Sequence, residues 1–330
     1  MKNKSIMFFI IAIIFMMLFN SCNNKNEKTN SNINIKSDVC ISDSSMIASE
    51  SKTNSANESK INIETNKYKI HEIDDVSFLS DKTGVFSDIS TNDDSWFPGK
   101  VIRDLATGEV SYIWDRSKET LSLIKKYGAI YRGDETKKEC YLTFDCGYEY
   151  SNDKYPNGLT PIILDILKDK NVKATFFVTG NYIKENTETV KRMYNEGHCV
   201  GTHTANHKHQ TTLTPKEFQY EILENERILR SNIPNAPEMT YYRPPEGSAN
   251  EMTLALAQAM GLTTVFWSAT QFDYDVDNQP EYNIALMKDK TMLHNGCVYL
   301  IHTISTTHTE ILGDLINYIK EEGYQIILFN

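Results

Sequence analysis

From Cys140 onward, short apolar runs alternate with longer segments in which apolar residues recur every three or four positions. Seven runs have the length and composition of buried strands: 141–144, 174–178, 199–202, 240–242, 263–267, 298–301 and 325–329. Six segments between them have helical periodicity: 161–170, 187–196, 215–230, 251–260, 283–292 and 309–322. At the start of the third helix, Thr214, Pro215 and Glu217 predict a capping box. Regular alternation of this kind is typical of parallel sheets.

Seven strands with six helices predict an α/β fold, a (β/α)7-type barrel that lacks one regular unit. An open, doubly wound sheet has the same alternation, so it is the alternative architecture. In both, chemistry collects where the carboxyl ends of the strands meet. The predicted barrel spans 139–330 and follows an N-terminal extension, 63–138, that we expect to pack on it.

The first 62 residues predict export and a tether. Lys2 and Lys4 precede an uncharged apolar run over 6–19, and Ser21-Cys22 follows where a lipoprotein signal is cut. Lipidation at Cys22, an uncleaved anchor and ordinary cleavage remain alternatives for 1–22, and each places the chain at the outer face of the cytoplasmic membrane or in the cell wall. Residues 23–62 are rich in Asn, Ser, Lys and Thr, the composition of a disordered tether.

Composition excludes some partners. The 330 residues carry a formal net charge of −10, with a sequence pI near 5.4, which argues against a nucleic-acid partner. Six cysteines without CxxC spacing predict neither a disulfide framework nor a zinc ribbon. We expect a monomer.

Titratable or polar groups follow five of the seven predicted strands. Asp145 and Cys146 end the first strand, and Gly147 then allows a tight turn. The later strands lead into single groups: His203, Arg243, Asp273 and His302. Because parallel strands end at one edge of a sheet, these groups are expected to share a site. For Asp145 alone, a turn-forming aspartate is the simpler interpretation.

His203 and His207 are the candidate metal ligands. If a helical turn follows the strand, residues four apart lie on one face and can share a cation. The Cys146 side chain is the best-placed third ligand, and His209 is a weaker choice. Two surface histidines on a helix are the alternative.

Three further groups have plain structural alternatives. Arg243 in YYRPPEG could hold Asp145 ionised or be a surface arginine. Asp273 is the acid nearest its strand, but Asp275 and Asp277 also fit a solvated acidic loop. His302 follows the apolar run VYLI, so a satisfied core histidine is its alternative.

Together these motifs resemble the NodB-like polysaccharide deacetylases, carbohydrate esterase family 4. The likeness covers about 95–329 and is nearest to the spore-cortex group that deacetylates muramic acid in peptidoglycan on the way to muramic delta-lactam. The motifs that carry it are KYGAIYRGD (126–134), TFDCGYE (143–149), FFVTG (176–180), EGHCVGTHTANH (196–207), YRPPEG (242–247), FWS (266–268) and LIHTIS (300–305).

The resemblance implies a distorted barrel and a metal-assisted hydrolase that removes N-acetyl groups from cell-wall glycan. It implies Asp145 as base, Arg243 holding that base, His302 as acid tuned by Asp273, and His203 and His207 on a divalent metal. With Cys146 as a thiolate ligand the expected ion is zinc; without it, the cation is weakly held. The groups expected to bind the substrate or the oxyanion are Tyr148, through its backbone N–H, and Pro244, Glu246 and Trp267.

Three departures from the family pattern keep alternatives open. Cys146 replaces the usual second aspartate, Glu246 stands where the muramic-acid group usually has Arg, and Tyr274 stands where Trp is usual. A deacetylase of N-acetylglucosamine in peptidoglycan, exopolysaccharide or chitin oligomers is therefore an alternative. The alternative from another class is a glycan-binding surface lipoprotein that has lost catalysis.

Overall fold

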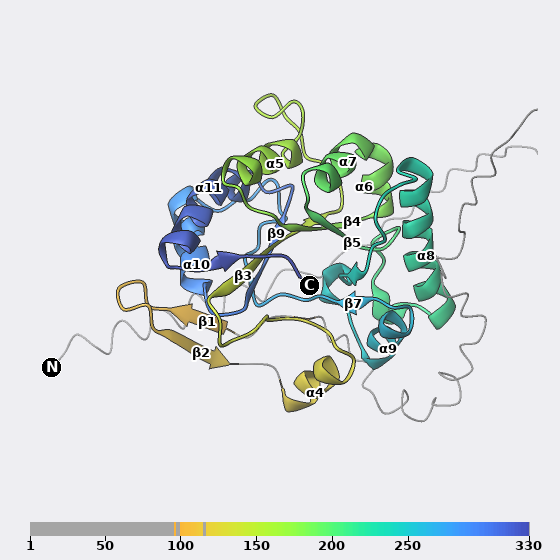
Figure 1. Ribbon diagram of the computed structural model, residues 1–330, viewed down its shortest axis with the longest axis horizontal. Coiled ribbons are helices and arrows are strands. Elements are labelled where there is room, and N and C mark those ends of the chain that lie inside the picture. The colour runs from red at the N-terminus through yellow and green to blue at the C-terminus, as the bar shows by residue number, and fades with distance from the viewer. Residues whose placement is uncertain (1–95, 97–99, 115–116, 330) are drawn as a thin grey trace, which may run out of the picture. The chain divides into compact units, whose positions relative to one another are not determined.

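The computed structural model of the protein describes residues 96, 100–114 and 117–329 (Figure 1). Three predicted segments lie outside the described residues: the signal (1–22), the tether (23–62) and residues 63–95 of the extension. No helix among the described residues is long and apolar enough to cross a membrane.

The central sheet is parallel throughout. Its order is β7-β6-β5-β4-β3-β9-β8, and β10 pairs with the start of β3. Its strands are β3 (Glu139–Cys146), β4 (Thr175–Val178), β5 (Cys199–Thr202), β6 (Tyr241–Tyr242), β7 (Thr263–Thr264), β8 (Ala269–Thr270), β9 (Cys297–His302) and β10 (Gln325–Ile326). The sheet curls into a half-barrel with β3 near its middle, which confirms the prediction of an α/β, barrel-type fold.

Helices lie around the outside of the sheet (Figure 1). They are α5 (Thr160–Asp169), α6 (Gly180–Glu185), α7 (Thr187–Asn195), α8 (Pro215–Asn232), α9 (Glu251–Ala259), α10 (Tyr282–Met292) and α11 (Thr306–Glu321). The capping box at Thr214 and Glu217 is present, as predicted. Glu149 caps α5 by accepting hydrogen bonds from the backbone N–H groups of Leu159 (2.8 Å) and Thr160 (3.1 Å). The sequence prediction missed α6, a short helix that Thr179 caps.

The strand predicted over 263–267 is wrong in its second half. The ladder stops after Thr264, and the chain crosses to the opposite edge of the sheet to form β8. The carbonyl groups of Val265 and Phe266 instead accept hydrogen bonds from the Arg243 guanidinium, both at 3.1 Å. A buried side chain therefore takes the acceptors that a neighbouring strand would otherwise use.

The core lies between the sheet and its helices. Phe144 and Phe176 stack with ring centroids 5.0 Å apart, and the inward faces of α5, α7 and α11 pack on the same cluster. Burying one such side chain contributes roughly 1.5–3 kcal/mol. This packing fixes the carboxyl ends of the strands in place. Cys140, Cys146, Cys199 and Cys297 are all free thiols.

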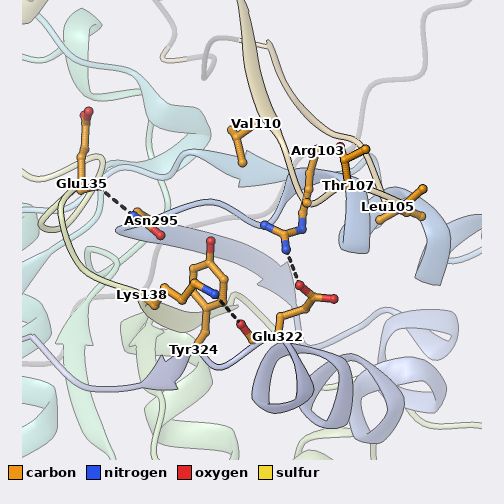
Figure 2. A pocket seen from close by; sticks show the side chains of 11 residues that line it. Arg103, Leu105, Thr107, Val110, Glu135, Lys138, Asn295, Glu322 and Tyr324 are labelled. Carbon is orange, nitrogen blue, oxygen red and sulfur yellow. Dashed lines mark hydrogen bonds and ion pairs between the residues drawn. The ribbon is translucent and has the colours of Figure 1, made fainter.

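The described part of the N-terminal segment contacts the sheet domain. It contains β1 (Lys100–Arg103), β2 (Val110–Trp114) and α4 (Lys118–Lys126). Figure 2 shows Arg103 directed at the Glu322 carboxylate beyond α11, across a polar hollow of about 480 Å³. Further along the sheet, Trp96 Nε1 donates a hydrogen bond to the Trp267 carbonyl at 3.0 Å.

Candidate active site

Asp145 lies at the carboxyl end of β3, paired in register with His302 on β9. The residue is buried, with 5% relative exposure, and it lines a cavity of about 1440 Å³. His203, His207 and His302 line the same cavity, so four of the predicted catalytic and metal-binding residues meet here. They come from the ends of β3, β5 and β9 and from the loop after β5.

Arg243 is fully buried behind Asp145. Its Nη1 donates a hydrogen bond to Asp145 Oδ1 at 2.8 Å, and its guanidinium lies 4.2 Å from the centroid of the Phe177 ring. Burial alone would raise the pKa of Asp145, but nearby positive charge, chiefly that of Arg243, outweighs burial and lowers that pKa. Asp145 is therefore held as a carboxylate at neutral pH, the form that can accept a proton.

The His203 ring has a defined tautomer. Its Nδ1 lies 2.8 Å from the Arg243 carbonyl, which can only accept, so Nδ1 carries the hydrogen. Nε2 is left with its lone pair toward the cavity, 3.6 Å from Asp145 Oδ2. The two imidazole rings, His203 and His207, have centroids 4.9 Å apart. Burial lowers the pKa of His203 to about 4 and also lowers the pKa of His207. Both rings are thus neutral, as metal ligands must be.

The two histidines do not share a helical turn, contrary to the sequence prediction. Thr204 and His207 have positive φ angles of 68° and 54°, which no right-handed helix contains. The Thr204 hydroxyl accepts the His207 backbone N–H at 3.1 Å, and this bond closes a loop. His209, the weaker candidate, lies 2.9 Å through Nδ1 from Glu246 Oε2.

Cys146 does not join the imidazoles. The side chain is wholly buried in the hydrophobic cluster that includes Val178 and Tyr182, and it does not line the cavity. Alternation along β3 explains this position, because Asp145 faces the cavity and the next residue faces the helices. Burial raises the pKa of the thiol well above its ordinary value, so it stays protonated. The structure therefore contradicts the prediction of a Cys146 thiolate ligand.

Replacing Cys146 by Ala should leave activity and cation affinity within about twofold of wild type and cost roughly 1–2 kcal/mol of stability. The reason is that the thiol fills core space and touches nothing in the cavity. Urea unfolding and acetate release at several zinc concentrations check this. A large loss of zinc affinity in the variant would restore the thiol as a ligand.

His302 is paired with the buried carboxylate of Asp273. His302 Nδ1 lies 2.6 Å from Asp273 Oδ1, and the His302 backbone N–H donates to Asp273 Oδ2 at 2.9 Å. Burial lowers the pKa of His302, but the Asp273 carboxylate outweighs burial and raises it. The His302 side chain is 25% exposed and lines the cavity, so it can deliver a proton to a bound substrate.

Three of the four predicted substrate-binding residues line the cavity, and Pro244 does not. Tyr148 (50% exposed), Glu246 and Trp267 line the cavity. Among the described residues, none accepts a hydrogen bond from the Tyr148 backbone N–H. Pro244 is buried and does not line the cavity; its carbonyl accepts the Gly247 N–H at 3.0 Å and shapes the turn. Tyr274 packs edge-on to His302, with ring centroids 5.6 Å apart.

Several cavity residues were missed because nothing in their local sequence marks them. They are Trp96, Phe272, Lys288 and Ile304. Trp96 precedes the barrel by some forty residues in the chain; at the site it packs on Phe266 and donates hydrogen bonds to the carbonyls of Trp267 and Gly247.

The donor set fits a divalent cation only in part. Two neutral imidazoles face the Asp145 carboxylate, and imidazole suits zinc and several other divalent metals. No group of three His, Cys, Asp or Glu side chains spaced for a metal occurs within 117–329 or the other described residues. His203 and His207 are therefore the side chains that would hold the cation.

Comparison with known proteins places this site in a family. The pattern described as "Polysaccharide deacetylase" matches residues 132–265. The chain is 39% identical over 211 residues to peptidoglycan-N-acetylmuramic acid deacetylase PdaA of Bacillus subtilis, covering 64% of this chain and 77% of PdaA. It is 33% identical over 193 residues to peptidoglycan-N-acetylglucosamine deacetylase PgdA of Listeria monocytogenes, covering 58% of this chain and 38% of PgdA.

The solved structure of Bacillus subtilis PdaA, described as a family 4 carbohydrate esterase, matches with a TM-score of 0.61 and 35% identity, covering 70% of this chain and 93% of PdaA. Members of this family are generally dependent on a divalent metal. The fold, the converging side chains and these matches give one conclusion: the chain belongs to the polysaccharide deacetylases, the carbohydrate esterases of family 4.

Proposed function

We propose that the protein hydrolyses the N-acetyl amide of an amino sugar in peptidoglycan, and that N-acetylmuramic acid is the sugar. The observation that carries the proposal is that one cavity is lined by both a base and an acid. Asp145 is held ionised by Arg243, and Asp273 raises the pKa of His302, which favours the protonated ring. This is the pair of groups that amide hydrolysis requires.

The base acts first. An acetamide is a weak electrophile, so the attacking water must lose a proton as it adds to the carbonyl carbon. Asp145 accepts that proton, and Arg243 keeps the carboxylate oriented toward the cavity through the 2.8 Å bond. A divalent cation on His203 and His207 would supply Lewis-acid polarisation of the acetyl oxygen.

Two further groups act after the water has attacked: a donor to the negative oxygen and the acid. The backbone N–H of Tyr148, which has no acceptor among the described residues, is available to the negative oxygen that develops on the carbonyl. His302 then gives its proton to the departing sugar nitrogen, which would otherwise leave as an unstable amide anion. The products are acetate and a free amino sugar.

Zinc is the proposed cation, since neutral imidazoles are common zinc ligands. With only two imidazoles, we expect weak binding. Calorimetric titration of the metal-free protein with zinc should show one binding site, and the His207→Gln substitution should remove it. Cobalt or manganese can replace zinc in the same assay. Unchanged zinc binding by the His207→Gln variant would contradict this assignment.

The sugar is decided by mass spectrometry of muropeptides treated with the purified full-length protein. We expect the loss of one acetyl mass located on muramic acid. The same loss located on glucosamine would contradict the proposed sugar while keeping the chemistry. Glycan retention without any loss of acetyl mass, with divalent cations supplied, would favour the non-catalytic glycan-binding alternative.

One observation favours the glucosamine alternative. The Glu246 side chain is 58% exposed at the cavity, and its backbone is held at φ 58°, a conformation that is unfavourable for residues other than glycine. A carboxylate kept at such a position places negative charge beside the substrate. It would repel the free lactyl carboxylate of peptide-free muramic acid, but not N-acetylglucosamine.

Replacing Glu246 by Gln should therefore raise kcat/KM for peptide-free muramic-acid glycan about three- to tenfold, because a repulsion of roughly 1 kcal/mol is removed. Activity on chitin oligomers should stay within twofold. Initial rates of acetate release on the two substrates, measured at low and high salt, check this. Equal effects on both substrates would show that charge at 246 does not select the sugar.

We also propose that the protein is exported and acts at the outer face of the cytoplasmic membrane as a monomer. The basic start, the apolar run over 6–19 and Cys22 support this location. Labelling cells with a radioactive fatty acid should mark the wild-type protein and not the Cys22→Ser variant. Full activity retained in a cytoplasmic fraction, without label, would contradict it.

A further inference from the structure

A second imidazole–carboxylate pair lies behind the proposed acid, away from the cavity. His308 is in the first turn of α11, and Asp289 is on α10; both are about 97% buried or more. His308 Nδ1 is 3.7 Å from Asp273 Oδ2, and His308 Nε2 is 3.5 Å from Asp289 Oδ2. Neither residue lines the cavity, so neither contacts the substrate.

The hydrogen bonds around His308 determine its tautomer. Gln279 Nε2 donates to the carbonyls of Asp273 (3.1 Å) and Asp275 (2.5 Å), which fixes the orientation of that amide. Gln279 Oε1 must then accept the Ser305 hydroxyl, 2.6 Å away. Having spent its hydrogen there, Ser305 Oγ can only accept from His308 Nδ1, at 3.0 Å. His308 Nδ1 therefore carries a hydrogen.

The carboxylate on the other side of the ring, Asp289, is held by Gln271. Gln271 Nε2 donates to Asp289 Oδ1 at 2.6 Å and to the Ala285 carbonyl at 2.8 Å. Asp289 Oδ2 has no hydrogen-bond partner in the described part of the chain, and it faces His308 Nε2. The His308 imidazole thus lies between two buried carboxylates, Asp289 and Asp273.

We propose that His308 is a positioning residue for the acid: its Nδ1–H, 3.7 Å from Asp273 Oδ2, donates to Ser305 Oγ and through Gln279 fixes the Asp273 segment, so that Asp273 Oδ1 holds the His302 ring toward the leaving nitrogen. Asp289 Oδ2 lies 3.5 Å from Nε2 on the other side of the ring. The inference rests on the proposed function, because it assigns His302 the task of protonating the departing amine.

Two substitutions distinguish the roles of the two ring nitrogens of His308. The amide nitrogen of Asn in His308→Asn reaches the place of Nδ1, whereas that of Gln in His308→Gln reaches the place of Nε2. Losing the hydrogen bond from Nδ1–H to the neutral Ser305 hydroxyl is worth roughly three- to tenfold in rate. His308→Gln should therefore lower kcat on N-acetylated glycan about three- to tenfold with KM unchanged, and His308→Asn should stay within about twofold of wild type.

A second substrate distinguishes positioning from a general structural role. The leaving group of 4-nitrophenyl acetate departs as a stable phenolate and needs no proton, so its hydrolysis does not depend on His302. His308→Gln should leave this reaction unchanged. A parallel fall on both substrates, an equal fall in the Asn and Gln variants, or no fall in either would overturn the proposal.

Nitrogen NMR of histidine-labelled wild-type protein tests the tautomer without any substitution. We expect a protonated Nδ1 for His308, and a bare Nδ1 would overturn the proposal even if the variants failed to fold. If the wild type releases no acetate from glycan, the proposed function fails, and the NMR result still decides the arrangement of the pair.

Discussion

Replacing Asp145 by Asn should lower kcat on N-acetylated glycan by about a hundred- to ten-thousandfold, the contribution of one positioned proton-transfer group. The same change should reduce stability by roughly 3–5 kcal/mol. The reason is that Arg243, which has no exposed side-chain surface and donates to Asp145 at 2.8 Å, loses the charge that compensates its own. Acetate release and urea unfolding measure the two effects separately.

The two effects can be separated within the same pair. Adding Arg243→Met to Asp145→Asn removes the uncompensated charge, so most of the lost stability should return while activity stays lost. A matched control is Asp165→Asn, which breaks the exposed contact with Arg192; it should cost no more than about 1 kcal/mol and leave activity intact. An Asp145→Asn variant with more than a tenth of wild-type activity would remove Asp145 from the role of base.

Replacing His302 by Gln should lower amide hydrolysis about a hundred- to ten-thousandfold and leave hydrolysis of 4-nitrophenyl acetate within a fewfold of wild type. His302 is needed only where the leaving group requires a proton. Asp145→Asn, in contrast, should impair both substrates, because both need the attacking water. Equal losses on both substrates in the His302→Gln variant would contradict its assignment as the acid.

The pH profile tests the same pairing. Burial lowers the pKa of His302 and Asp273 raises it more, so the protonated acid is present below that raised pKa and is lost as pH rises through it. Asp273→Asn removes the carboxylate, so the alkaline limb of kcat/KM should move to lower pH. Activity at about pH 8 should fall more than activity at about pH 6. An unmoved alkaline limb would show that Asp273 does not tune His302.

Much of the fold follows from local pattern. The runs that became β3, β4, β5 and β9 are continuous and apolar because both faces of those strands are buried, and such runs are recognisable in sequence. The strand predicted over 263–267 is too long, because the carbonyls of Val265 and Phe266 bind the side chain of Arg243, which lies 22 and 23 residues earlier. Only the folded chain brings those two segments together.

The site shows the same division. Side chains that directly follow strands could be predicted to converge, and Asp145, His203 and His302 do. Cys146 follows Asp145 directly and is therefore the nearest candidate ligand in sequence, but the alternation of β3 turns its thiol toward the core. His308 and Trp96 reach the site through tertiary contacts that no short motif records.

The most direct test of the account is acetate release from N-acetylated peptidoglycan glycan by the wild type and the Asp145→Asn variant, assayed side by side with zinc supplied. The account predicts acetate and new free amino groups in equal amounts from the wild type and almost none from the variant. No acetate from the wild type, or equal acetate from both proteins, would contradict it.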